Sequence, residues 1–300
     1  MSAGKASGFR ALWICLLLAA VILSALATGA RIDHASGIAG LIAAPGQPRR
    51  LAVSLSFDIE DAVDDNESIS VPLILRILEE HGAKATFFIT GKAADRNPGM
   101  VRMINQAGHE IGLHTNEHLF PVFDEDKAEK VAARYGTTFD YVWMMSYKSP
   151  AAFRRSLEAN RAAIRRAVGD VSIISFRSPC LVASWGDRPE YFGALLQSGI
   201  LVDSSILQDL SSSDSVLRGI YEREGVTQVP VTRGDDILRP GQMGIISRMQ
   251  AAGIPAVLFF HPKGFGGYEL ARLDRLLSAL ESEHDTTYLT VAEAAGFTSA

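Results

Sequence analysis

The segment "LAVSLSF" (51–57) is followed by "VPLILRILEEHG" (71–82) and then by "KATFFIT" (84–90). The first and third segments are short, apolar and rich in β-branched or aromatic residues, which favours buried strands. The middle segment has apolar residues at helical spacing and stops at a glycine, which favours a helix. A strand, a helix and a second strand in this order predict a parallel pair joined by a crossover helix.

The same alternation continues to the end of the chain. The segment "SPAAFRRSLEANRAAIRRAVG" (149–169) predicts a helix, with Ser149 as its N-cap and Pro150 at its first position. The segments "VSIISFR" (171–177) and "PAVLFFH" (255–261) predict two further strands. Alternation of this length predicts an α/β protein with a parallel sheet, either open or closed into a barrel.

Composition limits the kind of protein that this can be. The 300 residues allow one large domain or two small ones, and we assign 51–297 to one domain preceded by a Gly-, Ala- and Pro-rich linker at 31–50. The net charge of −5 argues against nucleic acid as the main partner. Of the two cysteines, Cys15 and Cys180, only the second lies in the predicted domain, which excludes a disulfide scaffold there.

The N-terminus predicts export. The segment "ALWICLLLAAVILSALATGA" (11–30) has no charged residue and follows Lys5 and Arg10. Roughly 20 apolar residues can span a bilayer as a helix, and the positive flank keeps the N-terminus cytoplasmic. We therefore expect residues 1–30 to be a signal anchor, with a signal peptide cleaved after Ala27 as the alternative. Either interpretation predicts a catalytic domain outside the cytoplasm, on a single-pass membrane protein or a secreted one.

Polar side chains stand at the ends of several predicted strands. In a parallel barrel the carboxyl ends of the strands share one face, where catalytic groups gather. We therefore predict a functional site formed by Asp58, His114, Arg177, Asp203 and His261.

The segment "HEIGLHTNEH" (109–118) allows two kinds of metal site. "HTNEH" matches the H-x-x-E-H motif of one class of zinc protease, in which His114 and His118 share a helix face. The strand-like "HEIGL" before the motif and Pro121 after it disfavour a long helix. Alternatively, the two histidines bind a divalent metal with a carboxylate from "SFDIED" (56–61), which leaves open positions for water and substrate.

Five motifs in order resemble those of the polysaccharide deacetylases, the family of the chitin, peptidoglycan and nodulation-factor deacetylases. They are "SFDIED" (56–61), "HTNEH" (114–118), "FRSPC" (176–180), "VDSS" (202–205) and "LFFH" (258–261). The resemblance implies a distorted parallel (β/α) barrel. It also implies a hydrolase of carbon–nitrogen bonds in linear amides that removes N-acetyl groups from a polysaccharide or oligosaccharide.

The resemblance also implies roles for individual residues. His114, His118 and Glu60 would hold one divalent ion, most simply Zn²⁺, with Asp61 as the alternative acid. Residues two apart on an extended strand share a face, which favours Glu60 beside the expected base, Asp58.

Arg177 would pair with the base Asp58, and the backbone N–H of Cys180 would bind the oxyanion. His261 would protonate the departing amine and would be oriented by Asp203. Phe259 and Trp185 would line the substrate pocket, and His109 has no chemical role in the family pattern.

Departures from the family pattern leave alternatives open. The first motif reads D-I-E-D, and Cys180 replaces an aromatic residue. The alternatives are an inactive relative that only binds glycan and an allantoinase-like amidohydrolase that acts on a small cyclic amide. The long segment 119–148, which we expect to be largely irregular, is either core packing or a wall of the substrate cleft.

Overall fold

The computed structural model describes residues 50–60, 66–185, 189–208, 210, 216–239 and 241–298, with side chains 66 and 183–185 excepted. The predicted anchor (11–30), the linker before residue 50 and Asp61 lie outside these residues. Within the described part of the chain, no helix is long and apolar enough to cross a membrane.

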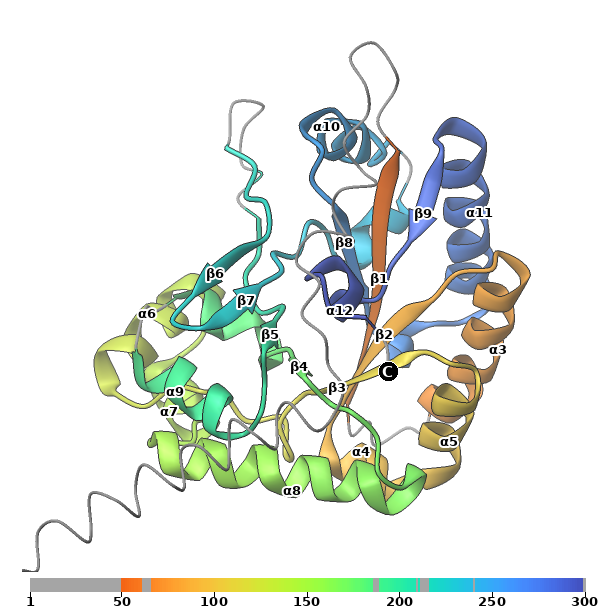
Figure 1. The fold of residues 1–300 in the computed structure, drawn as a ribbon. Coiled ribbons are helices and arrows are strands. Elements are labelled where there is room, and N and C mark those ends of the chain that lie inside the picture. Colours follow the sequence, from red (N-terminus) through yellow and green to blue (C-terminus); the bar gives the residue numbers. More distant parts are fainter. Residues whose placement is uncertain are drawn as a thin grey trace, which may run out of the picture.

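One curved sheet organises the domain (Figure 1). Its strands are β1 (Leu51–Ile59), β2 (Ala85–Ile89), β3 (Glu110–Leu113), β4 (Ser175–Phe176), β5 (Val202–Asp203), β6 (Tyr221–Arg223), β7 (Val226–Gln228), β8 (Ala256–Phe260) and β9 (Thr286–Tyr288). The order is β6-β7-β5-β4-β3-β2-β1-β8, and β9 pairs with the start of β1. Only the β6–β7 hairpin is antiparallel among the described pairs, so the predicted parallel sheet is confirmed.

The sheet is a half-barrel rather than a regular closed barrel. Isolated bridges join Leu207 to Val231 and Arg233 to Leu258. The segment after β7 therefore runs from the residues that follow β5 to the edge strand β8. The barrel is distorted, as predicted, because only single bridges, and no full strand pairing, join the segment after β7 to its neighbours.

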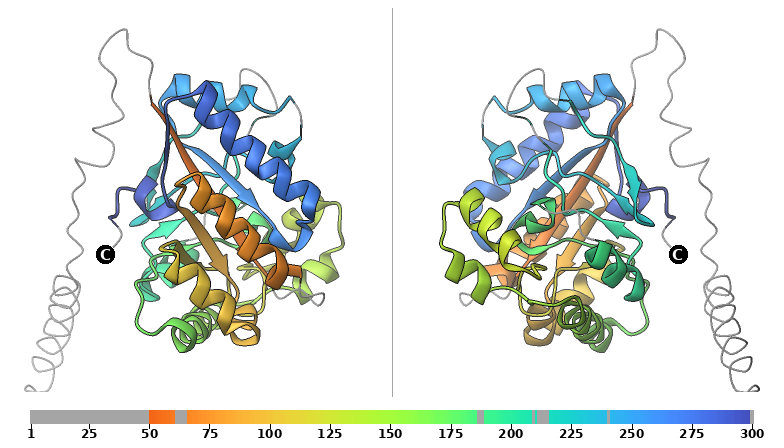
Figure 2. Two further views of the ribbon diagram at one scale, coloured as in Figure 1. Left: turned by 90° about the vertical axis from the view of Figure 1, so that its right-hand side faces the viewer. Right: turned by 90° about the vertical axis from the view of Figure 1, so that its left-hand side faces the viewer.

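Helices cover the sheet. They are α3 (Asn66–Glu80), α4 (Gly91–Arg96), α5 (Pro98–Gln106), α6 (Glu125–Tyr135), α7 (Phe139–Met144), α8 (Pro150–Val168), α9 (Pro189–Gln197), α10 (Gly244–Ala252), α11 (Gly267–Glu283) and α12 (Val291–Ala294). Short 3₁₀ turns are η1 (Pro179–Trp185), η2 (Asp235–Leu238) and η3 (Pro262–Gly264). The helices α11, α3 and α5 lie side by side on one face of the sheet (Figure 2).

The central strand β1 is buried along its whole length. It pairs with β2 over its carboxyl half and with β8 over its middle, and Phe57 stacks on Phe87 of β2 with the ring centroids 5.0 Å apart. A strand covered on both faces needs a nearly continuous apolar sequence, which "LAVSLSF" supplies. This burial fixes the end of β1, from which the first site residues project.

The helix α8 follows its sequence signals closely. The Ser149 side chain accepts a hydrogen bond from the Ala152 backbone N–H at 3.2 Å, and Pro150 is the first helical residue, as predicted. Further along α8, Asn160 is fully buried and donates to the backbone carbonyl of Ile89 at 2.9 Å. The helix is thereby tied to the end of β2.

The segment 119–148 is not irregular, and this expectation was wrong. It forms α6 and α7, each with a side-chain N-cap, Asp124 for α6 and Thr138 for α7. Buried Val131 and Val142 belong to a separate apolar cluster that also includes Val182 of η1. The segment therefore has a small core of its own beside the site.

Candidate active site

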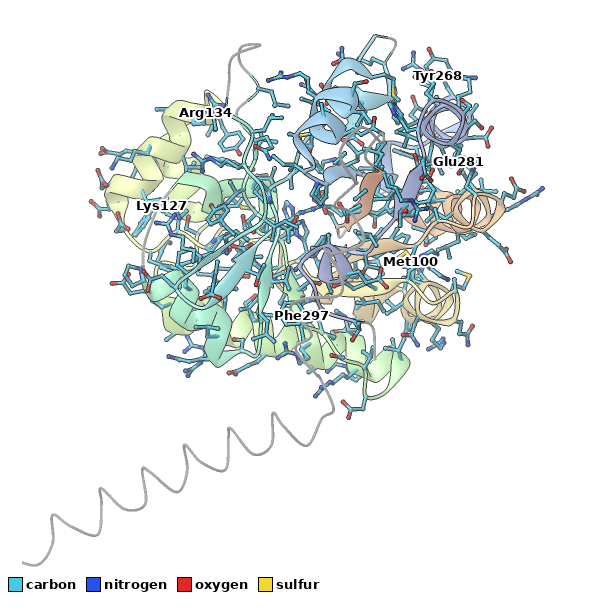
Figure 3. The ribbon with its side chains drawn as sticks, turned by 45° about the horizontal axis from the view of Figure 1, so that its top comes forward. Met100, Lys127, Arg134, Tyr268, Glu281 and Phe297 are labelled. Carbon is cyan, nitrogen blue, oxygen red and sulfur yellow. The ribbon has the colours of Figure 1, made fainter. Side chains whose placement is uncertain are left out.

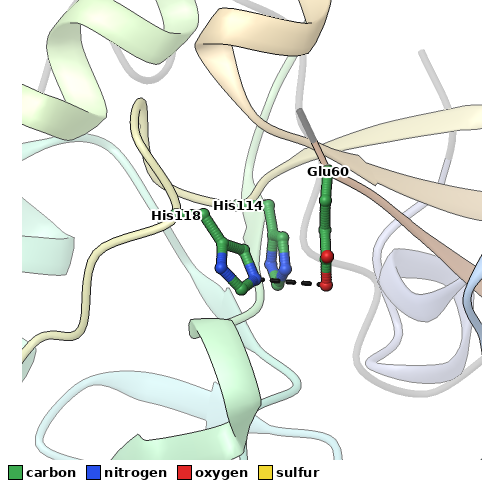
Figure 4. A group of neighbouring side chains, drawn as sticks. All are labelled: Glu60, His114 and His118. Carbon is green, nitrogen blue, oxygen red and sulfur yellow. Dashed lines mark ion pairs between the residues drawn. The ribbon is translucent and has the colours of Figure 1, made fainter. Parts of the chain in front are cut away.

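Glu60, His114 and His118 form the centre of the site (Figure 4). Glu60 follows β1 and His114 follows β3, so both stand at the carboxyl ends of neighbouring parts of the sheet. One ligand atom from each of the three residues lies within 4.8 Å of the others. The structure thus brings together the three residues that the family resemblance implied as metal ligands.

His114 is held as a neutral ring. Burial lowers its pKa to about 4, which outweighs the opposing charges of nearby acids such as Asp58. Its Nδ1 donates to the backbone carbonyl of Arg177 at 2.8 Å, and this bond leaves the Nε2 lone pair available to a cation. Its backbone N–H donates to Asn160 Oδ1 at 3.2 Å, which anchors the end of β3.

A strained loop presents His118 to the same centre. Thr115 and His118 have φ values of 58° and 60°, a left-handed conformation that is costly for residues other than glycine. The Gly91 N–H donates to the Thr115 carbonyl at 3.2 Å and helps to fix the loop. Residues 114–118 are not helical, and Glu117 accepts a hydrogen bond from Tyr147 at 3.0 Å. The protease interpretation, which needs a helix, is therefore wrong.

The three side chains fit a divalent cation. His118 Nε2 is buried, has no hydrogen-bond partner among the described residues and lies 3.2 Å from Glu60 Oε1. Burial raises the pKa of Glu60, but His118 and the ammonium of Lys263, which contacts Oε2, together lower it well below its usual range. Two imidazoles and one carboxylate are a ligand set that suits Zn²⁺ and leaves positions open.

Asp58 and Arg177 form a buried ion pair next to this centre. Arg177 Nη1 lies 2.8 Å from Asp58 Oδ1, and the Arg177 side chain has no exposed surface. The guanidinium also donates to Ser56 Oγ, to the Ser204 carbonyl and to Ser204 Oγ at 2.8 to 3.0 Å. It lies over the Phe88 ring, 4.3 Å from its centroid. The predicted pairing of Arg177 with Asp58 is confirmed, and the three other hydrogen bonds of the guanidinium fix the position from which it binds the Asp58 carboxylate.

His261 is oriented by Asp235, and the prediction of Asp203 was wrong. His261 Nδ1 lies 2.6 Å from Asp235 Oδ2, and the His261 backbone N–H donates to Oδ1 at 2.9 Å. Burial lowers the pKa of His261, but the bond to Asp235 and the charges of Asp58, Asp235 and Glu60 raise it above its usual value. The ring Nε2 lies 3.9 Å from Glu60 Oε1, so His261 borders the candidate metal site.

Asp203 instead supports the turn that follows Arg177. It is buried and accepts hydrogen bonds from Tyr191 Oη, at 3.0 Å, and from Ser205 Oγ. Ser205 Oγ in turn accepts the backbone N–H of Ser178 at 2.8 Å. Burial raises the pKa of Asp203 to about 6. Its side chain is therefore committed to this network on β5, which four strands separate from β8 in the sheet order.

The tertiary fold brings Asp235 to His261. The bridge from Arg233 to Leu258 places η2 beside the end of β8. Gly234 packs against the Phe259 ring, where an added Cβ would come within 2.7 Å of the ring. In the sequence, Asp235 is marked only by its place in the segment Gly234-Asp235-Asp236. This segment does not directly follow a predicted strand, so the strand-end pattern did not identify Asp235.

The turn at Cys180 has an unusual backbone. Cys180 and Leu181 have φ values of 53° and 52°. The hydroxyl of Tyr135, at the end of α6, donates to the Cys180 carbonyl and connects the 119–148 segment to this turn. Burial and the negative charge of Glu60 raise the pKa of the Cys180 thiol to about 11, so the thiol is neutral at pH 7.

The remaining predicted residues have mixed outcomes. The Phe259 ring is partly buried, with its centroid 5.4 Å from that of His261, and its place in a substrate pocket stays a prediction. The Trp185 side chain lies outside the described residues. His109 is away from the metal centre and its Nδ1 accepts the Ala85 N–H at 3.3 Å, as a structural residue would. Sequence reasoning did not identify Lys263 or Tyr135, which no motif marks.

Comparisons with known proteins agree with this arrangement. Residues 46–185 match the polysaccharide deacetylase family model. A peptidoglycan-N-acetylglucosamine deacetylase of Bacillus cereus is 32% identical over 102 residues, which cover 34% of this chain and 44% of that protein. A chitooligosaccharide deacetylase of Sinorhizobium fredii is 30% identical over 136 residues, which cover 45% and 49%. The aligned part thus spans less than half of either relative.

A solved structure extends the likeness in fold. A Mycobacterium smegmatis protein, provisionally assigned as a polysaccharide deacetylase, has a TM-score of 0.61 at 21% identity, over 85% of this chain and 92% of that one. This similarity covers the sheet beyond the residues that the family model matches. The chain is therefore similar to the polysaccharide deacetylases over residues 46–185, and beyond them it shares the fold of this solved structure.

Proposed function

We propose that this protein is a metal-dependent deacetylase that removes N-acetyl groups from a glycan outside the cytoplasm. The proposal rests on one observation. Asp58, which pairs with Arg177, and His261, which pairs with Asp235, both border the candidate metal site formed by Glu60, His114 and His118. The relatives' names support the substrate class, since one acts on peptidoglycan N-acetylglucosamine and the other on chitooligosaccharide. The candidate substrates are peptidoglycan, a chitin-like oligomer and an exopolysaccharide.

The residues divide the chemistry between them. A divalent ion held by Glu60, His114 and His118 would supply Lewis acid chemistry toward the acetyl carbonyl and the attacking water. Asp58 accepts a proton from that water, and Arg177 holds its carboxylate in one orientation. The rigid position of Arg177 means that little reorganisation is needed when the proton moves.

In the second half of the reaction, His261 gives a proton to the departing amine. Its raised pKa keeps a larger fraction of the ring protonated near neutral pH than an unperturbed histidine would have. Because Nδ1 is bonded to Asp235, the proton that is transferred resides on Nε2. The backbone N–H of Cys180 is the proposed donor to the oxyanion, positioned by the left-handed turn.

Metal content and acetate release together test the proposal. We expect about one divalent ion per chain, and we expect His118→Ala to lose both the ion and the acetate release from peptidoglycan, chitin oligomers or exopolysaccharide. His284→Ala is the matched control, since His284 bonds to Gln250 and does not border the site. Glu60→Ala should weaken metal binding and Asp61→Ala should not. A protein that binds metal but releases no acetate from any of these glycans would be the inactive relative instead.

Residues 11–30 are the basis of the proposed location. The proposal rests on the length of this uncharged segment and on the positive residues before it. Cell fractionation combined with the mass of the mature protein tests it. An anchored protein keeps its full mass in the membrane fraction, whereas a soluble form that begins near residue 28 would show cleavage. A full-length protein in the cytoplasm would contradict both forms of export.

A further inference from the structure

A cavity opens beside His261. It has a volume of about 460 Å³ and lies between η2, the turn after β8, and α11. Arg239, Lys263 and Arg272 contribute to its lining, together with His261. A volume of this size is sufficient for one sugar unit with a substituent, since ligand pockets are typically about 300–1,000 Å³. Because His261 belongs to both, a glycan in the active site would reach this cavity with its neighbouring unit.

The two acids of the cavity are already engaged within the protein. Asp235 uses both oxygens for the ring and the backbone N–H of His261. Glu269 Oε2 accepts the backbone N–H of Gly266 at 3.0 Å, at the start of α11. These carboxylates therefore serve His261 and a helix terminus and are not directed at the arginines.

The arginines lack acidic partners among the described residues. Arg272 lies over the ring of Tyr268, 4.0 Å from its centroid, and donates to the Tyr268 hydroxyl, which is uncharged. Tyr268 itself is 60% exposed at the start of α11 (Figure 3). Arg239 is exposed at the end of η2. Two guanidinium groups that face one cavity without acidic partners form a site that favours an anion.

We propose that this cavity binds an anionic substituent, a carboxylate or a phosphate, on the sugar unit next to the one that is deacetylated. The proposal rests on the proposed function and adds a charge requirement to its substrate. Lys263 connects the two sites, since its ammonium contacts Glu60 while its side chain lines the cavity. The substrate is thus an acidic glycan rather than a neutral chitin-like polymer.

The test compares two substrates and two arginine variants. Acetate release is measured with metal-loaded protein on chitotetraose and on an oligomer in which N-acetylmuramic acid alternates with N-acetylglucosamine. We expect a higher kcat/KM on the acidic oligomer, and we expect Arg239→Gln and Arg272→Gln each to lower the acidic-to-neutral ratio of kcat/KM by about tenfold, as for the loss of one charged hydrogen bond. Arg275→Gln is the matched control, because Arg275 is exposed on α11 and does not line the cavity.

Binding measurements separate this proposal from the catalytic one. Calorimetry with free N-acetylmuramic acid and with inorganic phosphate distinguishes a carboxylate site from a phosphate site, and both should bind more weakly to Arg239→Gln. Equal kcat/KM values on the two oligomers, unchanged by either variant, would overturn the anion site and leave the deacetylase proposal standing. Arginine-dependent binding without acetate release from any glycan would support the anion site and contradict the deacetylase proposal.

Discussion

Replacing Asp235 with asparagine tests which aspartate orients His261. The change keeps the size of the side chain but removes the charge that accepts from Nδ1 at 2.6 Å. A hydrogen bond to a charged group contributes about 1.5–3 kcal/mol, and solvent screening favours the lower value because the Asp235 side chain is 45% exposed. A loss of about 1.5 kcal/mol of transition-state stabilisation corresponds to a decrease of about tenfold in kcat.

The same variant should also change the pH dependence. Burial lowers the pKa of His261, and the Asp235 hydrogen bond is the largest of the effects that raise it above its usual value. A raised pKa keeps the proton-donating form to higher pH, so its loss should move the alkaline decline of activity to lower pH. Asp235→Asn should therefore decline earlier than the parent protein as the pH rises.

The assay is a pH–rate profile of acetate release with metal-loaded protein. Asp203→Asn is the comparison, because Asp203 bonds to Tyr191 and Ser205 and not to His261. It should leave the alkaline decline where it is in the parent protein. The reasoning is refuted if Asp235→Asn keeps the parental rate and profile, or if Asp203→Asn is the variant that shifts the alkaline decline.

Three further predictions concern stability and the thiol. Burial raises the pKa of Asp203 from 3.8 to about 6, so the folded state binds the proton more tightly, and stability should fall by about 3 kcal/mol as the pH rises through this interval. Urea titrations at pH 4 and pH 7 should show this decrease in the parent and not in Asp203→Asn. His81 lies 3.1 Å from Asp274 and 3.0 Å from Glu281; burial lowers its pKa, but the two acids raise it above the usual value. Its stabilisation should be present below the unfolded pKa and lost as the pH rises through the raised one, so the melting temperature of His81→Gln should approach that of the parent at alkaline pH. Cys180→Ala should keep near-parental turnover because the proposed donor is the backbone N–H, and the thiol, with its pKa near 11, should react slowly with iodoacetamide at pH 7.5, as followed by mass spectrometry.

The sequence alone determined the sheet and most of the metal centre. Segments such as "LAVSLSF" contain only apolar residues and small serines, a composition that favours a strand covered on both faces. The capping residue of α8 bonds to a backbone group only a few positions along the chain. The local sequence was therefore enough to predict Ser149 as the N-cap and Pro150 as the first helical residue. Parallel strands bring their carboxyl ends to one face, which is why Asp58 and His114 could be placed together before the fold was known, whereas Glu60 was implied only by the family resemblance.

Other features depended on contacts that no local pattern records. Asp235 meets His261 across 26 positions because the bridge between Arg233 and Leu258 places η2 against the end of β8. Asp203 stands at a strand end, as the site residues do, but burial beside Tyr191 commits it to a different network. Hydrophobic periodicity specifies which face of a strand or helix is buried, but a pair of side chains from distant segments is fixed only when the whole sheet sets their register. The sequence therefore determined the types of residue at the site and the face on which they gather, and only the tertiary structure decided which aspartate orients the histidine.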